Sequence, residues 1–320
     1  MKRSVLVGAL LGLAFAPVVW AQPASPKPDS RIETVIVTAP KYHFGVTPNA
    51  IAHDFVKSFA TPTVLRDAIA RWQVAICPDF EGLAPQYQTV MEARFRTIAG
   101  QAGAPMKEKG CKPNLSVVFT PQPQAYLDAL HAKNMDVVGY HGTTKVSHPI
   151  QAWYVTGMTD NCGSVVVDED GTLQLFTKCD FCHPPVMQIA STSTVPILSV
   201  GGWRDRPDIS SDLLYVTILV DADQTAHNTV GEIADYVAML ALSRTEDYDD
   251  CQLMPSITNL LSPNCDDKLR PSEITAGDIA YLRGVYKMDA GAKLLIQQGQ
   301  IAAEMEKAIP VKTSPSTGQQ

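Results

Sequence analysis

The stretch that decides the fold is Leu213-Leu-Tyr-Val-Thr-Ile-Leu-Val220, followed after a short connection by Thr229-Val-Gly-Glu-Ile-Ala-Asp-Tyr-Val-Ala-Met-Leu-Ala-Leu242. The first part is a continuous apolar run that stops at Asp221, a pattern typical of a strand buried on both faces. The second part begins with Thr229 and Glu232 at the spacing of a capping box. Its remaining residues are apolar nearly all round, which predicts a helix buried in the core. A buried strand leading into a buried helix forms the expected centre of the domain.

Outward from this centre, strand and helix patterns follow one another without regular alternation. Runs of β-branched and apolar residues predict short strands over 31–39, 115–120, 151–157, 165–167 and 173–176. Apolar residues at helical spacing predict helices over 64–72, 85–99, 122–132 and 290–309. Thr275 and Asp278 start one more helix, with Ile274 and Ile279 as a hydrophobic staple. This order favours an α+β fold with a mixed sheet, packed helices and a mainly helical C-terminal third.

The first 21 residues have the features of a signal peptide. Lys2 and Arg3 precede an apolar run over residues 5–16, and the small residues Val19 and Ala21 stand at positions −3 and −1 of a cleavage site. After cleavage, residues 22–60 are expected to form a linker and a strand-like N-terminal segment, 61–309 an α+β domain, and 310–320 a disordered tail. The length of the domain suits one large core or two lobes that divide near residue 145.

Charge and apolar content exclude two classes of partner. The 320-residue chain has 26 basic and 33 acidic residues and a formal charge of −7, which loss of the leader takes to −9. An acidic chain lacks the positive surface that binds nucleic acid or anionic membranes. Beyond the leader, no apolar run approaches the ~20 residues of a membrane helix. The mature chain is therefore expected to have no transmembrane segment and to be periplasmic or secreted, where disulfides persist.

The chain has seven cysteines, so at least one is unpaired, intermolecular or used in chemistry. Proximity in the sequence predicts the disulfides Cys77–Cys111 and Cys251–Cys265. In the chain-entropy model each of them stabilises the fold by ~3 kcal/mol. The three other cysteines all lie between residues 162 and 182. The odd cysteine is therefore one of these three.

A C-x-x-C-H motif stands in this region, at Lys178-Cys179-Asp-Phe-Cys182-His183. In an exported protein this is the attachment signature of haem c, with two thioethers to the cysteines and His183 as iron ligand. The residues before Cys179 have a strand pattern, whereas cytochrome c domains enter the motif from a helix. The favoured interpretation is a structural disulfide from Cys162 to Cys179 or Cys182, without a cofactor. Haem c is the first alternative, and a zinc site of Cys162, Cys179, Cys182 and His183 is the second.

Residues 32–39, Ile-Glu-Thr-Val-Ile-Val-Thr-Ala, resemble the TonB box of TonB-dependent outer-membrane receptors. Such a segment works by adding a strand to an exposed sheet edge of its partner. The resemblance implies a protein partner in the cell envelope, contacted by Glu33, Thr34, Val35, Val37 and Thr38. The rest of the chain lacks the alternating segments of a receptor barrel. An ordinary edge strand is the alternative interpretation.

Two further resemblances concern the domain. Stretches such as Cys77-Pro78, Cys111-Lys-Pro-Asn114 and Ala234-Asp-Tyr-Val-Ala-Met239 resemble an uncharacterised family of exported proteins from Gram-negative bacteria, which implies a shared fold of unassigned activity. The strand-then-helix order of residues 213–242 is similar to that of zinc metallopeptidases, whose helix carries H-E-x-x-H. Here the corresponding residues are Ala234-Asp-Tyr-Val-Ala238, without histidine. That resemblance extends to architecture only.

No complete catalytic constellation stands in the sequence. The leading hypothesis is therefore an exported, non-catalytic binding or envelope-associated protein that contacts TonB through residues 32–39. The alternatives are a periplasmic electron-transfer protein with haem on Cys179, Cys182 and His183, and a degenerate, zincin-like pseudo-peptidase.

Overall fold

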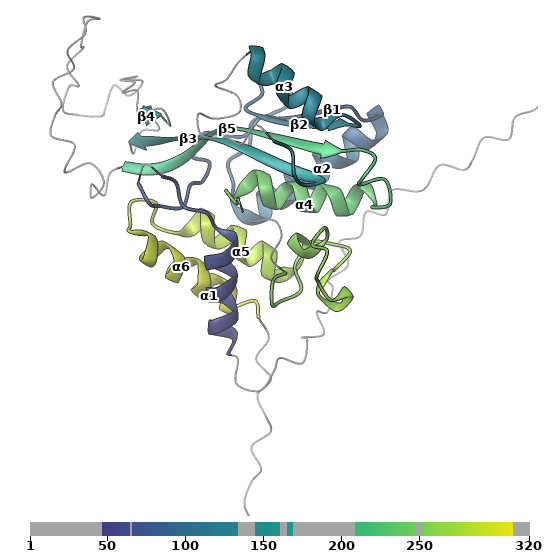
Figure 1. Cartoon of the computed structure of the whole chain (residues 1–320). Helices are drawn as coiled ribbons and strands as arrows, with labels where there is room; N and C mark the ends of the chain where they lie inside the picture. The colour runs from purple at the N-terminus through teal and green to yellow at the C-terminus, as the bar shows by residue number, and fades with distance from the viewer. Residues whose placement is uncertain are drawn as a thin grey trace, which may run out of the picture. The chain divides into compact units, whose positions relative to one another are not determined.

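The computed structural model describes residues 47–64, 66–133, 145–160, 165–168, 209–246 and 251–309 (Figure 1). Its strands are β1 (Pro78–Glu81), β2 (Leu115–Thr120), β3 (Ile150–Asp160), β4 (Val165–Asp168) and β5 (Ile209–Asp221). Its α-helices are α1 (Pro48–Phe59), α2 (Pro85–Ala102), α3 (Pro123–Lys133), α4 (Val230–Leu242), α5 (Ala276–Lys287) and α6 (Leu294–Glu306). Two short 3-10 helices, η3 (Ile257–Asn259) and η4 (Asp267–Leu269), lie between α4 and α5. The expected α+β class is confirmed.

The five strands form one mixed sheet in the order β1-β2-β5-β3-β4. β1, β2 and β5 run parallel, with Phe80 beside Val117 and Val117 beside Ile218. β3 is antiparallel to both β5 and β4. β5 is the middle strand, which explains why its apolar run is continuous: a strand covered on both faces has no solvent side.

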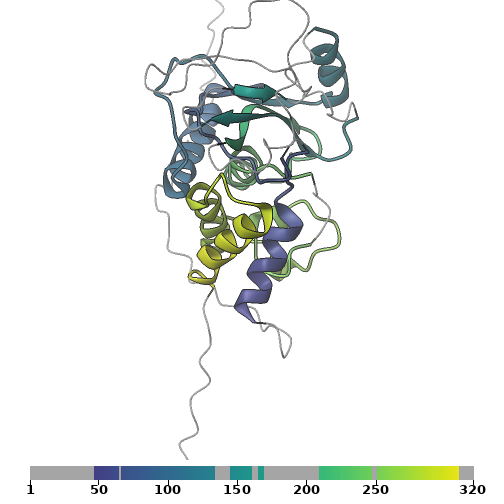
Figure 2. The ribbon, with the colours of Figure 1, turned by 90° about the vertical axis from the view of Figure 1, so that its left-hand side faces the viewer.

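Helices cover both faces of this sheet (Figure 1). α2 and α4 pack against one face, where Val117, Val216 and Ile218 contribute to the main core. α3 lies on the other face, where Leu127 joins a smaller cluster of buried residues, Val118, Trp153 and Leu219. α5, α6 and α1 form a further layer beyond α4, and α1 lies alongside α6 in both views (Figure 2).

The two capping boxes predicted from the sequence are present. The Thr229 hydroxyl accepts from the Glu232 amide at 3.2 Å, and the Glu232 carboxylate accepts from the Thr229 amide at 2.7 Å. At the start of α5, the Thr275 hydroxyl accepts from the Asp278 amide at 3.0 Å, and Asp278 accepts from the Thr275 amide at 2.9 Å. Each box satisfies two helix-terminal amides that have no partner within the helix.

Both predicted disulfides are also present. Cys77 and Cys111 are joined across a Cα–Cα distance of 6.0 Å, and Cys251 and Cys265 across 5.1 Å. The first links the start of β1 to the segment that enters β2, and the second closes the loop that contains η3. None of the helices in the described part of the chain combines the length and apolarity that a bilayer crossing requires.

The prediction of a helix over residues 64–72 is wrong. Asp67 has a positive φ of 54°, which interrupts helical geometry. Beyond it the chain is extended, because Arg71 pairs with the start of β5: the Arg71 amide donates to Ser211 O and the Leu213 amide donates to Arg71 O. The Trp72 side chain is buried, and its indole N–H donates to Ala241 O at 2.7 Å. This apolar segment is therefore buried as an extended chain and not as a helix.

Three expected boundaries differ from the structure. α1 lies inside the range 22–60 that was expected to be linker and strand, and its Ile51, Phe55 and Phe59 belong to the main core. α6 covers Leu294–Glu306 and is shorter than the expected 290–309. No lobe boundary falls near residue 145, since β2, before it, and β3, after it, both pair with β5. The leader and the tail lie outside the described residues.

Candidate functional site

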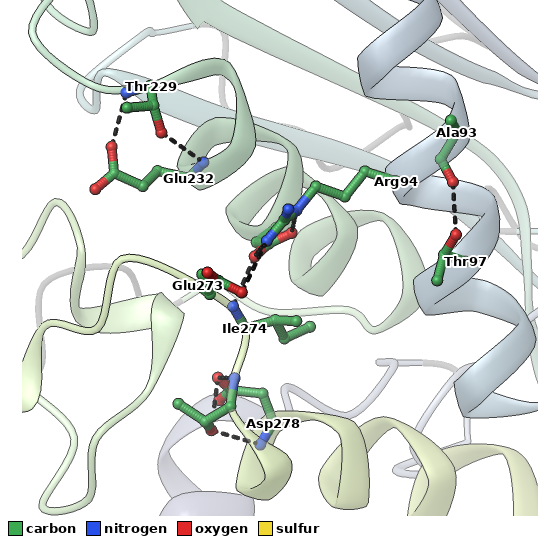
Figure 3. A network of polar contacts seen from close by, with 10 residues as sticks. Ala93, Arg94, Thr97, Thr229, Glu232, Glu273, Ile274 and Asp278 are labelled. Atoms are coloured by element: carbon green, nitrogen blue, oxygen red, sulfur yellow. Dashed lines mark hydrogen bonds and ion pairs between the residues drawn. The ribbon is translucent and has the colours of Figure 1, made fainter. Parts of the chain in front are cut away.

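The centre of α4 is occupied by a buried ion pair. Asp235 is 0% exposed, and its carboxylate accepts two hydrogen bonds from the Arg94 guanidinium of α2, one of them at 2.7 Å. It also accepts from the Ile274 amide, just before α5, at 2.6 Å. The hydrogen bonds to Asp235 raise the pKa of Arg94. One carboxylate therefore ties α2, α4 and the start of α5 together (Figure 3).

This geometry decides what α4 can do chemically. In the resemblance to zinc metallopeptidases expected from the sequence, Asp235 corresponds to the glutamate of H-E-x-x-H, and Ala234 and Ala238 correspond to its two histidines. Both alanines are buried in the main core. A general base needs a free lone pair beside the substrate. At Asp235, the carboxylate is instead occupied by Arg94 and a backbone amide, so this part of α4 is structural.

A second buried carboxylate lies at the start of β5. Asp212 is 2% exposed, and its two oxygens accept from the hydroxyls of Thr159 on β3 and Ser210 on β5, the latter at 3.1 Å. The Gln73 amide donates to the Ser210 hydroxyl, which also lies 3.2 Å from that of Thr159. We call Gln73, Thr159, Ser210 and Asp212 the Asp212 cluster. Burial raises the pKa of Asp212 to about 6, against the opposing effect of these hydrogen bonds.

Arg71, whose positive charge acts on Asp212, makes its own hydrogen bonds elsewhere. The Arg71 guanidinium donates to the carbonyl oxygens of Tyr286 at 2.8 Å and Met288 at 3.0 Å, at the C-terminal end of α5. Such carbonyls have no partner within the helix and attract positive charge. Arg71 lowers the pKa of Asp212 by electrostatic attraction, without an ion pair. Asp212 is thus a buried carboxylate with neutral hydrogen-bond donors.

Asp278 is a third buried carboxylate. Besides its capping role, it accepts from the Ser256 hydroxyl at 2.5 Å and from the Ile257 amide at 3.0 Å. Burial raises the pKa of Asp278, whereas these hydrogen bonds lower it. Asp278 thereby connects the disulfide-closed loop around η3 to the first turn of α5. Figure 3 shows its hydrogen bonds at the start of that helix.

The other predicted site residues lie outside the described residues. These are the haem or metal residues Cys162, Cys179, Cys182 and His183, and the partner-binding residues Glu33, Thr34, Val35, Val37 and Thr38. Within the described ranges, no group of three His, Cys, Asp or Glu side chains is arranged to hold a metal ion.

The sequence analysis did not identify the Asp212 cluster. Its members come from three separate segments, and Gln73 and Ser210 are 137 positions apart. One signal was visible: Ser210 and Asp212 directly precede the apolar run of β5 at alternate positions, which places two polar side chains on one face of a buried strand. Polar groups buried in a sheet need partners, and here the neighbouring segments supply them.

Comparisons with known proteins identify no relative of this chain. No family model, no curated protein and no solved structure matches the chain.

Proposed function

We propose that this protein is an exported binding protein without a catalytic site of its own, and that it attaches to a TonB-type envelope partner through residues 32–39. Three features support the proposal. The chain begins with the features of a signal peptide, two disulfides stabilise its domain, and a β-branched segment suited to strand addition precedes that domain.

The hydrogen bonds that occupy Asp235 are the observation that supports the absence of peptidase activity in this proposal. The helix position at which a zinc peptidase has its general base is here Asp235, whose carboxylate accepts hydrogen bonds from Arg94 and from the Ile274 amide. An enzyme of that class would need this carboxylate free and histidines on either side. We therefore expect the mature protein to show no peptidase activity with or without added zinc.

A titration tests the partner. The mature chain is titrated into the C-terminal domain of TonB and followed by calorimetry, beside the variants Val35→Pro and Val35→Thr. Strand addition depends on backbone N–H groups, which proline lacks. We expect binding by the wild type and by Val35→Thr, and at least tenfold weaker binding by Val35→Pro. No binding of the wild type at high micromolar concentration overturns the partner claim.

A visible spectrum tests the competing function. The protein is expressed in a host with cytochrome maturation machinery, because haem attachment to Cys179 and Cys182 requires it. A Soret band, with covalent haem on a denaturing gel, would assign the protein to electron transfer and overturn the non-redox proposal. We expect neither signal. A mass comparison after full reduction and alkylation then counts the disulfides, for which we predict three, with one free thiol.

A further inference from the structure

The start of β5 lies at a seam between three chain segments. On one side, the extended segment around Arg71 pairs with β5 through two backbone hydrogen bonds of 3.4 and 3.0 Å. On the other side, β3 pairs with β5 and has a register shift between Val155 and Thr156. Such a shift interrupts the regular ladder of a sheet. Beyond the shift the ladder continues from Thr156 opposite Leu213 to Asp160 opposite Ile209, and the Asp212 side chain adds hydrogen bonds to this backbone pairing.

Asp212 joins all three segments. Its carboxyl group accepts from Thr159 of β3 and from Ser210 of β5, and Ser210 accepts in turn from Gln73 of the third segment. All these donors are neutral. A carboxylate removed from water and given only neutral donors keeps an uncompensated charge, which is costly in a buried position.

Among the residues that the structure describes, no charged side chain forms an ion pair with Asp212. Arg71 is the charged side chain that faces it among the described residues, and it donates to the α5 carbonyls instead. Arg71 also faces the phenol of Tyr286. From the loop after α1, Thr63 presents a hydroxyl, 2.8 Å from that of Ser211.

We propose that Asp212 is a proton-operated catch, which holds the ends of β3 and β5 together when protonated and loosens them when ionised. The protonated carboxyl donates its O–H to the Thr159 or Ser210 hydroxyl, and no buried charge remains. The ionised carboxylate gains hydration when the seam opens. Gly157 to Thr159 of β3 also pair with β4, so opening of the seam loosens the part of β3 on which β4 is paired.

Hydrogen exchange of the mature protein tests the catch. Peptides covering 155–160 and 209–213 are followed by mass spectrometry from pH 4.5 to 7.5, with correction for intrinsic exchange. If opening fully hydrates Asp212, the opening constant rises by roughly thirtyfold over this range and levels off above pH 6. The Asp212→Asn variant, which cannot ionise, should show no such rise.

Asp221→Asn is the matched control, because Asp221 is a buried aspartate at the other end of β5 and accepts from the amides of Asp223 and Gln224 in its own turn. Its profile should match the wild type. If Asp212→Asn does not fold, Thr159→Val serves instead: losing a donor to the carboxylate shifts the wild-type plateau to higher pH. A pH-independent wild type, or an equal rise in Asp212→Asn, overturns the proposal.

Discussion

Asp235 and Asp212 are both buried aspartates, yet the structure uses them in opposite ways. Asp235, on α4, is paired with the Arg94 guanidinium. Asp212, on β5, has hydroxyl partners and no ion pair among the described residues. Their burial is similar, so the partner and not the depth decides their behaviour. The charged partner of Asp235 compensates the buried charge, whereas the neutral partners of Asp212 do not, and burial raises the pKa of Asp212.

Removing Arg94, the charged partner of Asp235, should give the largest loss in the free energy of unfolding. Arg94→Ala leaves the Asp235 carboxylate buried without compensation, and we expect the free energy of unfolding to fall by ~3–5 kcal/mol. Urea denaturation at pH 7 measures the loss. Arg96→Ala, on the same helix, removes an i,i+4 pair with Glu92, a carboxylate that is 23% exposed and keeps its ion pair with Lys109. It should cost ~1 kcal/mol or less. Equal losses in the two variants would contradict the structural role of Asp235.

Asp278 provides an intermediate case, a buried carboxylate with neutral donors inside a capping box. In Asp278→Asn, the new side-chain NH2 group cannot accept the hydrogen bonds that the carboxylate accepts, which include those from the backbone amides of Ile257 and Thr275. We expect a loss of ~2–3 kcal/mol in the free energy of unfolding, because buried donors lose their acceptor. Asp266→Asn is the control, since it caps η4 at an exposed position where asparagine serves equally well. A loss below that of the control would show that the box carries little energy.

The smallest effect concerns pH. The pKa of Asp212 is raised from 3.8 to about 6, so its stabilising contribution is fully present below pH 3.8 and is lost as the pH rises through 6. Relative to Asp212→Asn, the wild type should therefore lose ~2 kcal/mol of unfolding free energy between pH 4 and pH 7. Urea denaturation of both proteins over this range measures it, and the difference cancels the titration of Asp278. A difference that stays constant with pH would contradict the raised pKa of Asp212.

Local sequence signals predicted much of the fold. The capping boxes at Thr229 and Thr275, the helix that starts at Pro85, and the run of β2 all depend on residues close together in the chain, and all are confirmed. The two disulfides are confirmed too. Each joins two cysteines that follow one another in the sequence, so proximity along the chain was enough to predict them.

What the sequence did not reveal depends on distant partners. Residues 64–72 have the apolar spacing of a helix, but Arg71 pairs with Ser211 and Leu213, which overrides local propensity. α4 was predicted as a core helix, yet nothing local identified Arg94, 141 positions before Asp235, as its partner. The Asp212 cluster has the same origin, since it exists only after three segments have met.

The central position of β5 also determines when this protein can complete its fold. β2 pairs with β5 and not with β3, the strand that follows it in the chain. Leu115 can therefore pair with Val216 only after β5 has been synthesised. The core between β2 and α4 forms later still, because α4 follows β5 in the chain. Closing the long loop between β2 and β5 costs entropy before their contacts contribute favourable free energy, and this cost slows folding. More than two hundred residues of the chain must therefore be available before the sheet can form, and until then its apolar strands are exposed to aggregation.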